Sequence, residues 1–417
     1  MRSAPVLVSA ALLAAALAPA TAAEAAKKPA KPYDFDGDGR RDVSVIVPDG
    51  ALQATPGTDL IAVRYGTGRR QVLTRKSAGL KKILLNDLDL NPQAVSADFD
   101  RDGYADLAGI AGPEGVNLPF VIYGSKKGLS SRVSALPTQA GILSANGLTV
   151  GDFNGNGRPD LALGLGWGAS VFYDVHKGGR TGARPVSGTK AEFTQVSAGD
   201  FNGDGKADLF TIGDDGLDEP RVLFGSRDGL RSKPLILPIP LPEYTLNREL
   251  RLASADYDGD GDLEVAISVP GAVKVYGQAG GPLTELTTVS TFPAEAVSLA
   301  TGDLDKDGRT DLAIGFASED KVRLFYGSRK GLRYKKSVTP STKGVPGGKG
   351  RRFGVQVRLS DVTGDGRADL VVAVKSSAYI LRSTARGAAT GRVTTITGRT
   401  FGLKPFHFDV YWGARLR

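Results

Sequence analysis

One short acidic motif recurs seven times along the chain, and this repetition constrains the fold more than any other feature. The first copy is DFDGDGRRD, beginning at Asp34, and the apolar stretch VSVIV follows it. Further copies begin at Asp98, Asp152, Asp200, Asp256, Asp303 and Asp361, so successive copies start 64, 54, 48, 56, 47 and 58 residues apart. A period of roughly 50 residues indicates a repeat architecture in which each copy belongs to one supersecondary unit.

Each repeat reads as four short strands. The apolar runs after the motif, such as DLAIGF and DLVVAV, are nearly continuous, which is typical of strands covered on both faces. A second marker of the form aromatic-Gly-Ser-x-x-Gly-Leu begins at Tyr123, Phe224 and Tyr326, and its glycines suit a hairpin turn. Four strands in about 50 residues are typical of a propeller blade. The sequence therefore predicts an all-β, seven-bladed β-propeller with four-stranded blades over residues 34–417.

The two ends of the repeat region predict how the ring closes. The first motif lies too near the start of the repeats for a strand of its own unit to precede it. The tail Thr400–Trp412 has no motif after it. We expect this C-terminal strand to supply the missing inner strand of the first blade, which removes an exposed sheet edge.

The N-terminal residues have the layout of a secretory signal peptide. A short basic start is followed by the apolar run Ala4–Ala18 and by small residues suited to cleavage. We predict a signal peptide at residues 1–23 and a short linker at residues 24–33. The protein is then secreted and extracellular, with cell-wall association as an open alternative, and no later stretch reaches the ~20 apolar residues of a membrane span. Cysteine is absent, so stability has to come from the core or from bound metal.

The motif has the spacing of an all-oxygen cation site. Oxygen-bearing side chains occupy the first, third and fifth positions, glycine the sixth, and an acid the ninth. The seventh position varies, as expected where only a backbone carbonyl is used. This donor set favours Ca²⁺ over Mg²⁺ and predicts up to seven Ca²⁺ ions. The predicted ligands are Asp34, Asp36, Asp38, Arg40 and Asp42; Asp98, Asp100, Asp102, Tyr104 and Asp106; Asp152, Asn154, Asn156, Arg158 and Asp160; Asp200, Asn202, Asp204, Lys206 and Asp208; Asp256, Asp258, Asp260, Asp262 and Glu264; Asp303, Asp305, Asp307, Arg309 and Asp311; and Asp361, Thr363, Asp365, Arg367 and Asp369.

Two other interpretations of the motif are weaker. An EF-hand needs a glutamate at the twelfth position and flanking helices, whereas here the twelfth residues are apolar, Gly or Thr and strands are expected on both sides. Asp-Gly clusters also occur as simple turns, but seven copies with the same grid of oxygens argue against that. The third motif has only two carboxylates and the seventh contains Thr363, so these two are expected to bind a cation most weakly.

These repeats resemble FG-GAP repeats, the units of the seven-bladed propeller of integrin α-chains, and the related VCBS-type calcium-loop repeats. The resemblance rests on the acidic motif and covers the chain from about Asp34 onward. The element that gives FG-GAP its name appears clearly only as RRFGVQV (Arg351–Val357), and VPGA (Val269–Ala272) approaches the second half. The resemblance implies calcium loops on one face of the disc and ligands that engage the opposite face.

No catalytic constellation stands out in the sequence. The two histidines, His176 and His407, lie far apart, and no nucleophile elbow, zinc-protease helix or phosphate loop is present. We therefore expect a non-catalytic binding or adhesion module with a protein or glycan partner. A propeller lectin and a polysaccharide lyase or glycosidase are the alternatives. The presence of only two tryptophans, Trp167 and Trp412, argues against a sugar platform in every blade.

The charge outside the motifs is strongly positive. The motifs hold 25 of the 45 acidic residues, so 20 acids face most of the 53 Lys and Arg residues. A basic disc favours an anionic polymer, such as one of a cell wall, although scattered surface lysines explain the balance equally well. The densest basic stretches are residues 343–354 and 246–251. Aromatic residues do not interleave with them, so no specific nucleic-acid partner is expected. The protein is expected to be a monomer.

Overall fold

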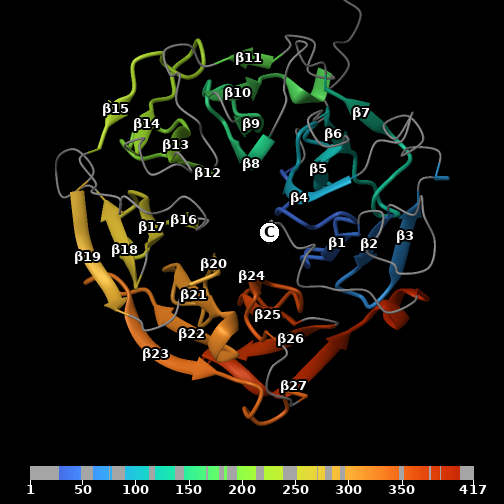
Figure 1. Cartoon of the computed structure of the whole chain (residues 1–417). Coiled ribbons are helices and arrows are strands. Elements are labelled where there is room, and N and C mark those ends of the chain that lie inside the picture. The colour runs from blue at the N-terminus through green and yellow to red at the C-terminus, as the bar shows by residue number, and fades with distance from the viewer. Residues whose placement is uncertain are drawn as a thin grey trace, which may run out of the picture.

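The computed structural model describes residues 28–47, 60–74, 76–77, 90–111, 118–136, 145–165, 168–177, 183–185, 195–212, 220–237, 251–269, 271–277, 284–291, 296–346, 352–374, 377–385 and 387–403. Seven antiparallel sheets surround a common centre, as Figure 1 shows. In every sheet the strands are hydrogen-bonded in chain order. The predicted all-β, seven-bladed propeller is confirmed.

The first three sheets contain the strands β1 to β11. The first sheet comprises β1 (Val43–Val47), β2 (Leu60–Arg64) and β3 (Arg70–Thr74). The second comprises β4 (Leu90–Ala97), β5 (Asp106–Ala111), β6 (Leu118–Ile122) and β7 (Val133–Ala135). The third comprises β8 (Ala145–Gly151), β9 (Asp160–Leu165), β10 (Gly168–Phe172) and β11 (Ala183–Pro185).

The remaining four sheets contain four strands each. The fourth comprises β12 (Gln195–Gly199), β13 (Asp208–Ile212), β14 (Arg221–Leu223) and β15 (Leu235–Ile236). The fifth comprises β16 (Leu252–Ala255), β17 (Glu264–Val269), β18 (Ala272–Gly277) and β19 (Thr284–Thr291). The sixth comprises β20 (Ser298–Gly302), β21 (Asp311–Phe316), β22 (Lys321–Tyr326) and β23 (Arg333–Val338). The seventh comprises β24 (Gln356–Ser360), β25 (Asp369–Val374), β26 (Ser377–Thr384) and β27 (Gly387–Ile396).

The helical segments in the described part of the chain are three short 3₁₀ turns. They are η2 (Val175–Lys177), η3 (Ala317–Glu319) and η4 (Gly398–Phe401). Each is far too short to cross a bilayer.

In the six four-stranded blades, the strand after the acidic motif is buried because it lies second from the centre, between neighbouring sheets. Every residue of β5, β21 and β25 is buried, which explains their unbroken apolar runs. Apolar clusters join adjacent blades rather than filling one blade. In one of them, Phe99 and Ile110 of the second blade pack with Leu163 of the third. Full burial of such a side chain contributes about 1.5–3 kcal/mol, so the packing between blades is a main source of stability.

The first and seventh blades meet through apolar packing and a backbone hydrogen bond. Val43 and Leu60 of the first blade share a cluster with Ile380 of the seventh and with Phe401 of η4. The N–H of Arg41 donates to the carbonyl of Asp361 at 2.8 Å.

The first sheet has three strands among the described residues, and β1 is its innermost strand. Residues 404–417, most of the tail predicted to complete it, lie outside the described residues, so closure by a C-terminal strand remains a prediction. Tyr33, in the predicted linker, lies against the second blade, where its N–H donates to Ser96 Oγ at 2.8 Å.

Candidate cation-binding loops

Each acidic motif forms the loop between the innermost strand of a blade and the next strand, or precedes β1 in the first blade. The second motif, for example, joins β4 to β5. In all seven loops the carboxylate at the first position accepts the N–H of the sixth-position glycine at 2.6–3.1 Å. That glycine has a positive φ throughout, for example +89° at Gly103, which side chains rarely adopt. The seven loops therefore share one backbone conformation.

The acid at the ninth position is buried and ties the loop to the blade. In all seven loops it accepts the N–H of the second-position residue at 2.7–3.1 Å. Asp106, which is fully buried, also accepts the N–H of Gly124 at 2.8 Å. The equivalent bond recurs at Asp42, Asp208 and Asp311, and at Asp369 with Ser383 as donor. The ninth residue thus connects the loop to the aromatic-Gly hairpin, a role that the sequence did not reveal.

Carboxylates converge in four of the seven loops. Oxygens from three acids lie within 4.8 Å of one another in groups formed by Asp34, Asp36 and Asp42; Asp98, Asp100 and Asp106; Asp256, Asp258 and Asp260; and Asp303, Asp305 and Asp311. The third, fourth and seventh loops form no such group in the described part of the chain. Each carries a neutral residue, Asn154, Asn202 or Thr363, at the third position.

Of the four groups of converging carboxylates, only the one in the fifth loop includes the fifth-position residue, Asp260. In every loop the side chain at this position accepts the N–H of the seventh residue at 2.8–3.0 Å, as Asp38 does from Arg40. That the fifth-position side chain also binds Ca²⁺ remains a prediction. The same is true of the seventh-position backbone carbonyl.

Buried oxygens without a hydrogen-bond donor lie at the third position of several loops. They are Asp36 Oδ1, Asp100 Oδ1 and Asp305 Oδ1, joined by Thr363 Oγ1 in the seventh loop. A buried carboxylate oxygen without a partner is costly, and a cation is the partner that would satisfy it among other carboxylates. Hard oxygen donors at this spacing fit Ca²⁺. The residues present therefore fit the cation that the sequence predicts.

An arginine side chain from the outer hairpin pairs with the third-position aspartate in two of these loops. Arg69 Nη2 lies 3.1 Å from Asp36 Oδ2, and its guanidinium stacks 3.5 Å from the ring centre of Tyr65. In the second blade Arg132 lies 2.5 Å from Asp100 Oδ2 and 3.8 Å from the ring centre of Tyr123. The arginine takes one carboxylate oxygen and leaves Oδ1 inside the loop.

The third and fourth loops differ at this position. The amide oxygens of Asn154 and Asn202 each accept the N–H of the fifth residue of their own loop at 3.0 Å. The third-position oxygen is therefore used within the loop in both cases, although Asp160 Oδ1 at the ninth position of the third loop is buried without a donor.

Burial raises the pKa of the ninth-position acids. It raises the pKa of Asp42, Asp106 and Asp160 to about 8 each, with neighbouring carboxylates adding to the shift at all three. For Asp311 the same causes raise the pKa to about 7. Without a bound cation these groups are therefore partly protonated near neutral pH.

Cation-free protein is expected to lose stability as pH rises. Because the folded pKa values lie above the ordinary value near 4, folding binds protons between pH ~4 and ~8, and stability falls across that window. Cation binding requires the ionised acids, so the stabilisation by Ca²⁺ grows over the same range. Melting temperatures at pH 5 and pH 8, with Ca²⁺ and with EDTA, measure both trends. A melting temperature in EDTA that rises toward pH 8 would contradict the expectation.

Backbone hydrogen bonds join each loop to its neighbour around the ring. The N–H at the eighth position donates to the first-position carbonyl of the preceding loop at 2.7–3.0 Å in five places: Arg41 to Asp361, Ala105 to Asp34, Ala207 to Asp152, Thr310 to Asp256 and Ala368 to Asp303. The third loop has Pro159 at this position, which lacks the N–H. In the described part of the chain Leu263 of the fifth loop makes no such bond.

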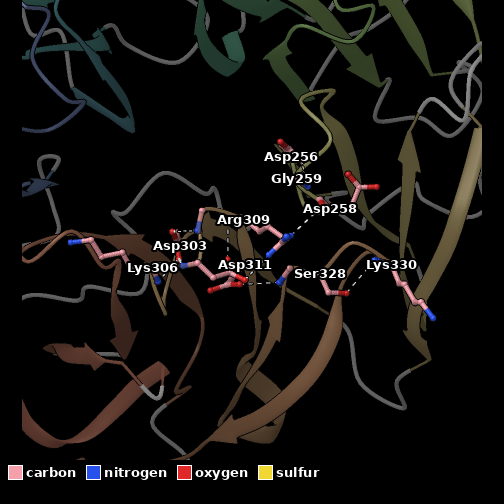
Figure 2. A network of polar contacts seen from close by, with 12 residues as sticks. Asp256, Asp258, Gly259, Asp303, Lys306, Arg309, Asp311, Ser328 and Lys330 are labelled. Atoms are coloured by element: carbon pink, nitrogen blue, oxygen red, sulfur yellow. Dashed lines mark hydrogen bonds and ion pairs between the residues drawn. The ribbon is translucent and has the colours of Figure 1, made fainter.

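Side chains at the seventh position reinforce these joints. Figure 2 shows Arg309 of the sixth loop reaching the fifth, where its Nε donates to the carbonyl of Asp258 at 3.2 Å. A methyl group placed on Gly259, at the fourth position of that loop, would lie 3.1 Å from the Arg309 side chain. Tyr104 lies in the same way against Gly37. The variable seventh position therefore serves contact between loops.

The hairpin glycines provide a second contact between blades. Gly128 has φ +92°, and a methyl group there would overlap the hydroxyl of Tyr65 in the preceding blade. That hydroxyl accepts the N–H of Leu129 at 3.0 Å. Gly229 lies equally close to Tyr173, whose hydroxyl accepts the N–H of Leu230 at 2.9 Å. The recurring aromatic residue before the hairpin is thus an anchor for the next blade.

Comparison with known proteins agrees with this architecture. The FG-GAP-like repeat family matches residues 98–163, 152–211 and 256–314. No curated protein matches the chain significantly.

Among solved structures, an Agrocybe aegerita lectin that recognises non-reducing terminal N-acetylglucosamine is 14% identical, with a TM-score of 0.56 over 89% of this chain and 97% of that chain. The BBS1N chain of a complex with ARL6DN is 14% identical, with a TM-score of 0.46 over 74% of this chain and 82% of that chain. At 14% identity the likeness to the lectin concerns the fold alone. The repeats, the loops and the seven sheets together identify the chain as a seven-bladed β-propeller that carries FG-GAP-like repeats, as in the N-terminal propeller of integrin α-chains.

Proposed function

We propose that this protein is a secreted, calcium-stabilised binding module with a protein partner, or alternatively a glycan partner, and without catalytic activity. Propellers of FG-GAP-like repeats suggest a protein-binding module. The single observation that supports the calcium part is the recurrence of buried, donor-free oxygens within convergent carboxylates, as at Asp36, Asp100 and Asp305. The proposal of secretion rests on the N-terminal sequence, which lies outside the described residues.

The residues of this chain determine what a cation does here. Asp100 and Asp106 would offer oxygens to it, while Arg132 holds Asp100 from the other side. When bound, Ca²⁺ supplies positive charge that offsets the repulsion among these carboxylates. The loop is then fixed against the hairpin through the bond from Gly124 to Asp106. Metal binding would in this way stiffen one face of the disc.

Calorimetric titration tests the calcium part of the proposal. Protein stripped of metal is titrated with CaCl₂ and, separately, with MgCl₂. We expect more than one Ca²⁺ to bind per chain and Mg²⁺ to bind more weakly, because Mg²⁺ demands a stricter octahedral shell. Binding of no Ca²⁺, or a clear preference for Mg²⁺, would overturn it.

A further inference from the structure

Most of the chain between the sixth and seventh acidic loops carries only positive charge. From residue 321 to residue 360 it has twelve Lys or Arg residues and no Asp or Glu. This segment includes β22, β23 and β24, and so the outer half of the sixth blade. A run of one sign over about a tenth of the chain creates a local positive potential, because its twelve cations have no acids between them.

The cations gather on the outermost strand of the sixth blade and on the hairpin before it. Arg329, Lys330, Arg333 and Lys335 are all exposed. Within the described residues, the first three form no ion pair with an acid. Figure 2 shows Lys330 pointing away from the acidic loops. These four residues, with Tyr334 and Lys336, are named here the basic edge.

An aromatic side chain lies in the middle of the basic edge. Tyr334 is 58% exposed, and it is one of two large hydrophobic residues exposed in the described part of the chain. Its ring meets Phe325 edge-on with centroids 5.6 Å apart, which holds it in place. A fixed, exposed tyrosine amid cations is a typical anchor for a partner.

Among the described strands, none pairs with the outer side of β23. β23 pairs with β22 on one side, with one register shift between Leu324 and Phe325, and with no other described strand. Six residues long, it exceeds the outer strands β7, β11 and β15, which have three, three and two residues, and is shorter than β19 and β27, which have eight and ten. Its cations keep two copies from pairing edge to edge, because like charges would face each other.

We propose that the basic edge binds an acidic, extended segment of a partner protein, which adds to β23 as a further strand. Residues two apart on a strand are about 6.8 Å apart, and an extended peptide has the same spacing. Acidic side chains at alternate positions can then face the cations of β23 while the two backbones exchange hydrogen bonds. This inference rests on the proposed binding function, for which it names the surface and the partner class.

Fluorescence anisotropy with a labelled peptide of alternating Glu and Thr tests the inference. All measurements are made in Ca²⁺, on the full chain. Reversal of two charges, Arg333→Glu with Lys335→Glu, should weaken binding by about tenfold or more. The matched control, Lys126→Glu with Lys127→Glu, reverses two exposed cations on the corresponding hairpin of the second blade and should leave affinity nearly unchanged. Equal loss in both variants would overturn the inference.

Two further probes separate strand addition from attraction between charges alone. The same peptide with N-methyl groups at alternate residues keeps its charge but loses backbone donors, so it should bind more weakly. Polygalacturonate, an anionic polysaccharide, should bind less tightly than the peptide. Binding of both at the strength of the peptide would overturn the inference. Because the calorimetric calcium titration is independent of these assays, failure here is distinguishable from failure of the calcium proposal.

Discussion

Removal of Ca²⁺ with EDTA will lower the melting temperature by on the order of 10 °C. Each site filled well above its dissociation constant adds about 3–4 kcal/mol to the folded state, and four loops bring three carboxylates together. Without the cation, the donor-free oxygens of Asp36 and Asp100 stay buried among like charges. Scanning calorimetry in Ca²⁺ and in EDTA measures the shift. An unchanged melting temperature would mean that the loops are structural turns.

A variant of the second loop tests the same idea, because its effect on the melting temperature should differ between Ca²⁺ and EDTA. Asp100→Asn removes one charge next to Asp98 and Asp106 while keeping the shape of the side chain. In Ca²⁺ it should lower the melting temperature, because a ligand charge is lost. In EDTA the loss should be smaller or become a gain, because relief of the repulsion offsets the lost ion pair with Arg132. Asp228→Asn, an exposed residue on the hairpin of the fourth blade, is the control and should change neither melt.

The second large effect is expected at Gly128. Gly128→Ala places a methyl group on the hydroxyl of Tyr65, across the interface between the first two blades. The backbone also has a φ of +92°, which costs about 1 kcal/mol for any side chain. Forced overlap in a packed site adds about 1–3 kcal/mol. We expect a total loss of roughly 2–4 kcal/mol in the free energy of unfolding, measured by denaturant titration.

Gly331 provides the matched control for that substitution. It occupies the same hairpin position in the sixth blade with a φ of +80°, but a methyl group there meets no atom within 4 Å. Gly331→Ala should therefore show only the backbone cost. If both variants lose the same stability, the contact with Tyr65 contributes nothing.

The architecture could be predicted from the sequence because the repeated motif gives the number of structural units. Seven copies of one motif with buried strands after each require seven similar units, and the unit length allows four strands. The roles of the first-position oxygens and the sixth-position glycine could also be predicted, because the hydrogen bond between them spans fewer than six residues, as between Asp98 and Gly103.

Contacts between distant residues could not be read in the same way. The donor to Asp106 lies 18 residues away at Gly124, and the arginine that holds Asp36 lies 33 residues away. The contact of Gly128 with Tyr65 crosses between blades. Each of these residues recurs visibly in the sequence, but their pairing depends on the fold. The recurring aromatic-Gly pair was the available signal, but its separation from the ninth acid varies from 16 residues at Asp311 to 24 at Asp42, so spacing alone does not pair them.

The joints between loops divide the closed disc into two unequal arcs. Bonded joints connect the loops of blades five, six, seven, one and two in one series and those of blades three and four in another. Pro159 and Leu263 mark the two breaks in the backbone bonds, and the Arg158 side chain crosses the first of them to the carbonyl of Asp100 at 3.5 Å. All four loops with convergent carboxylates belong to the longer arc, whereas in the shorter arc the side-chain oxygens of Asn154 and Asn202 accept N–H groups of their own loops. A fall in calcium should therefore loosen the longer arc and spare blades three and four, so the disc would soften asymmetrically while its hydrophobic ring stays closed.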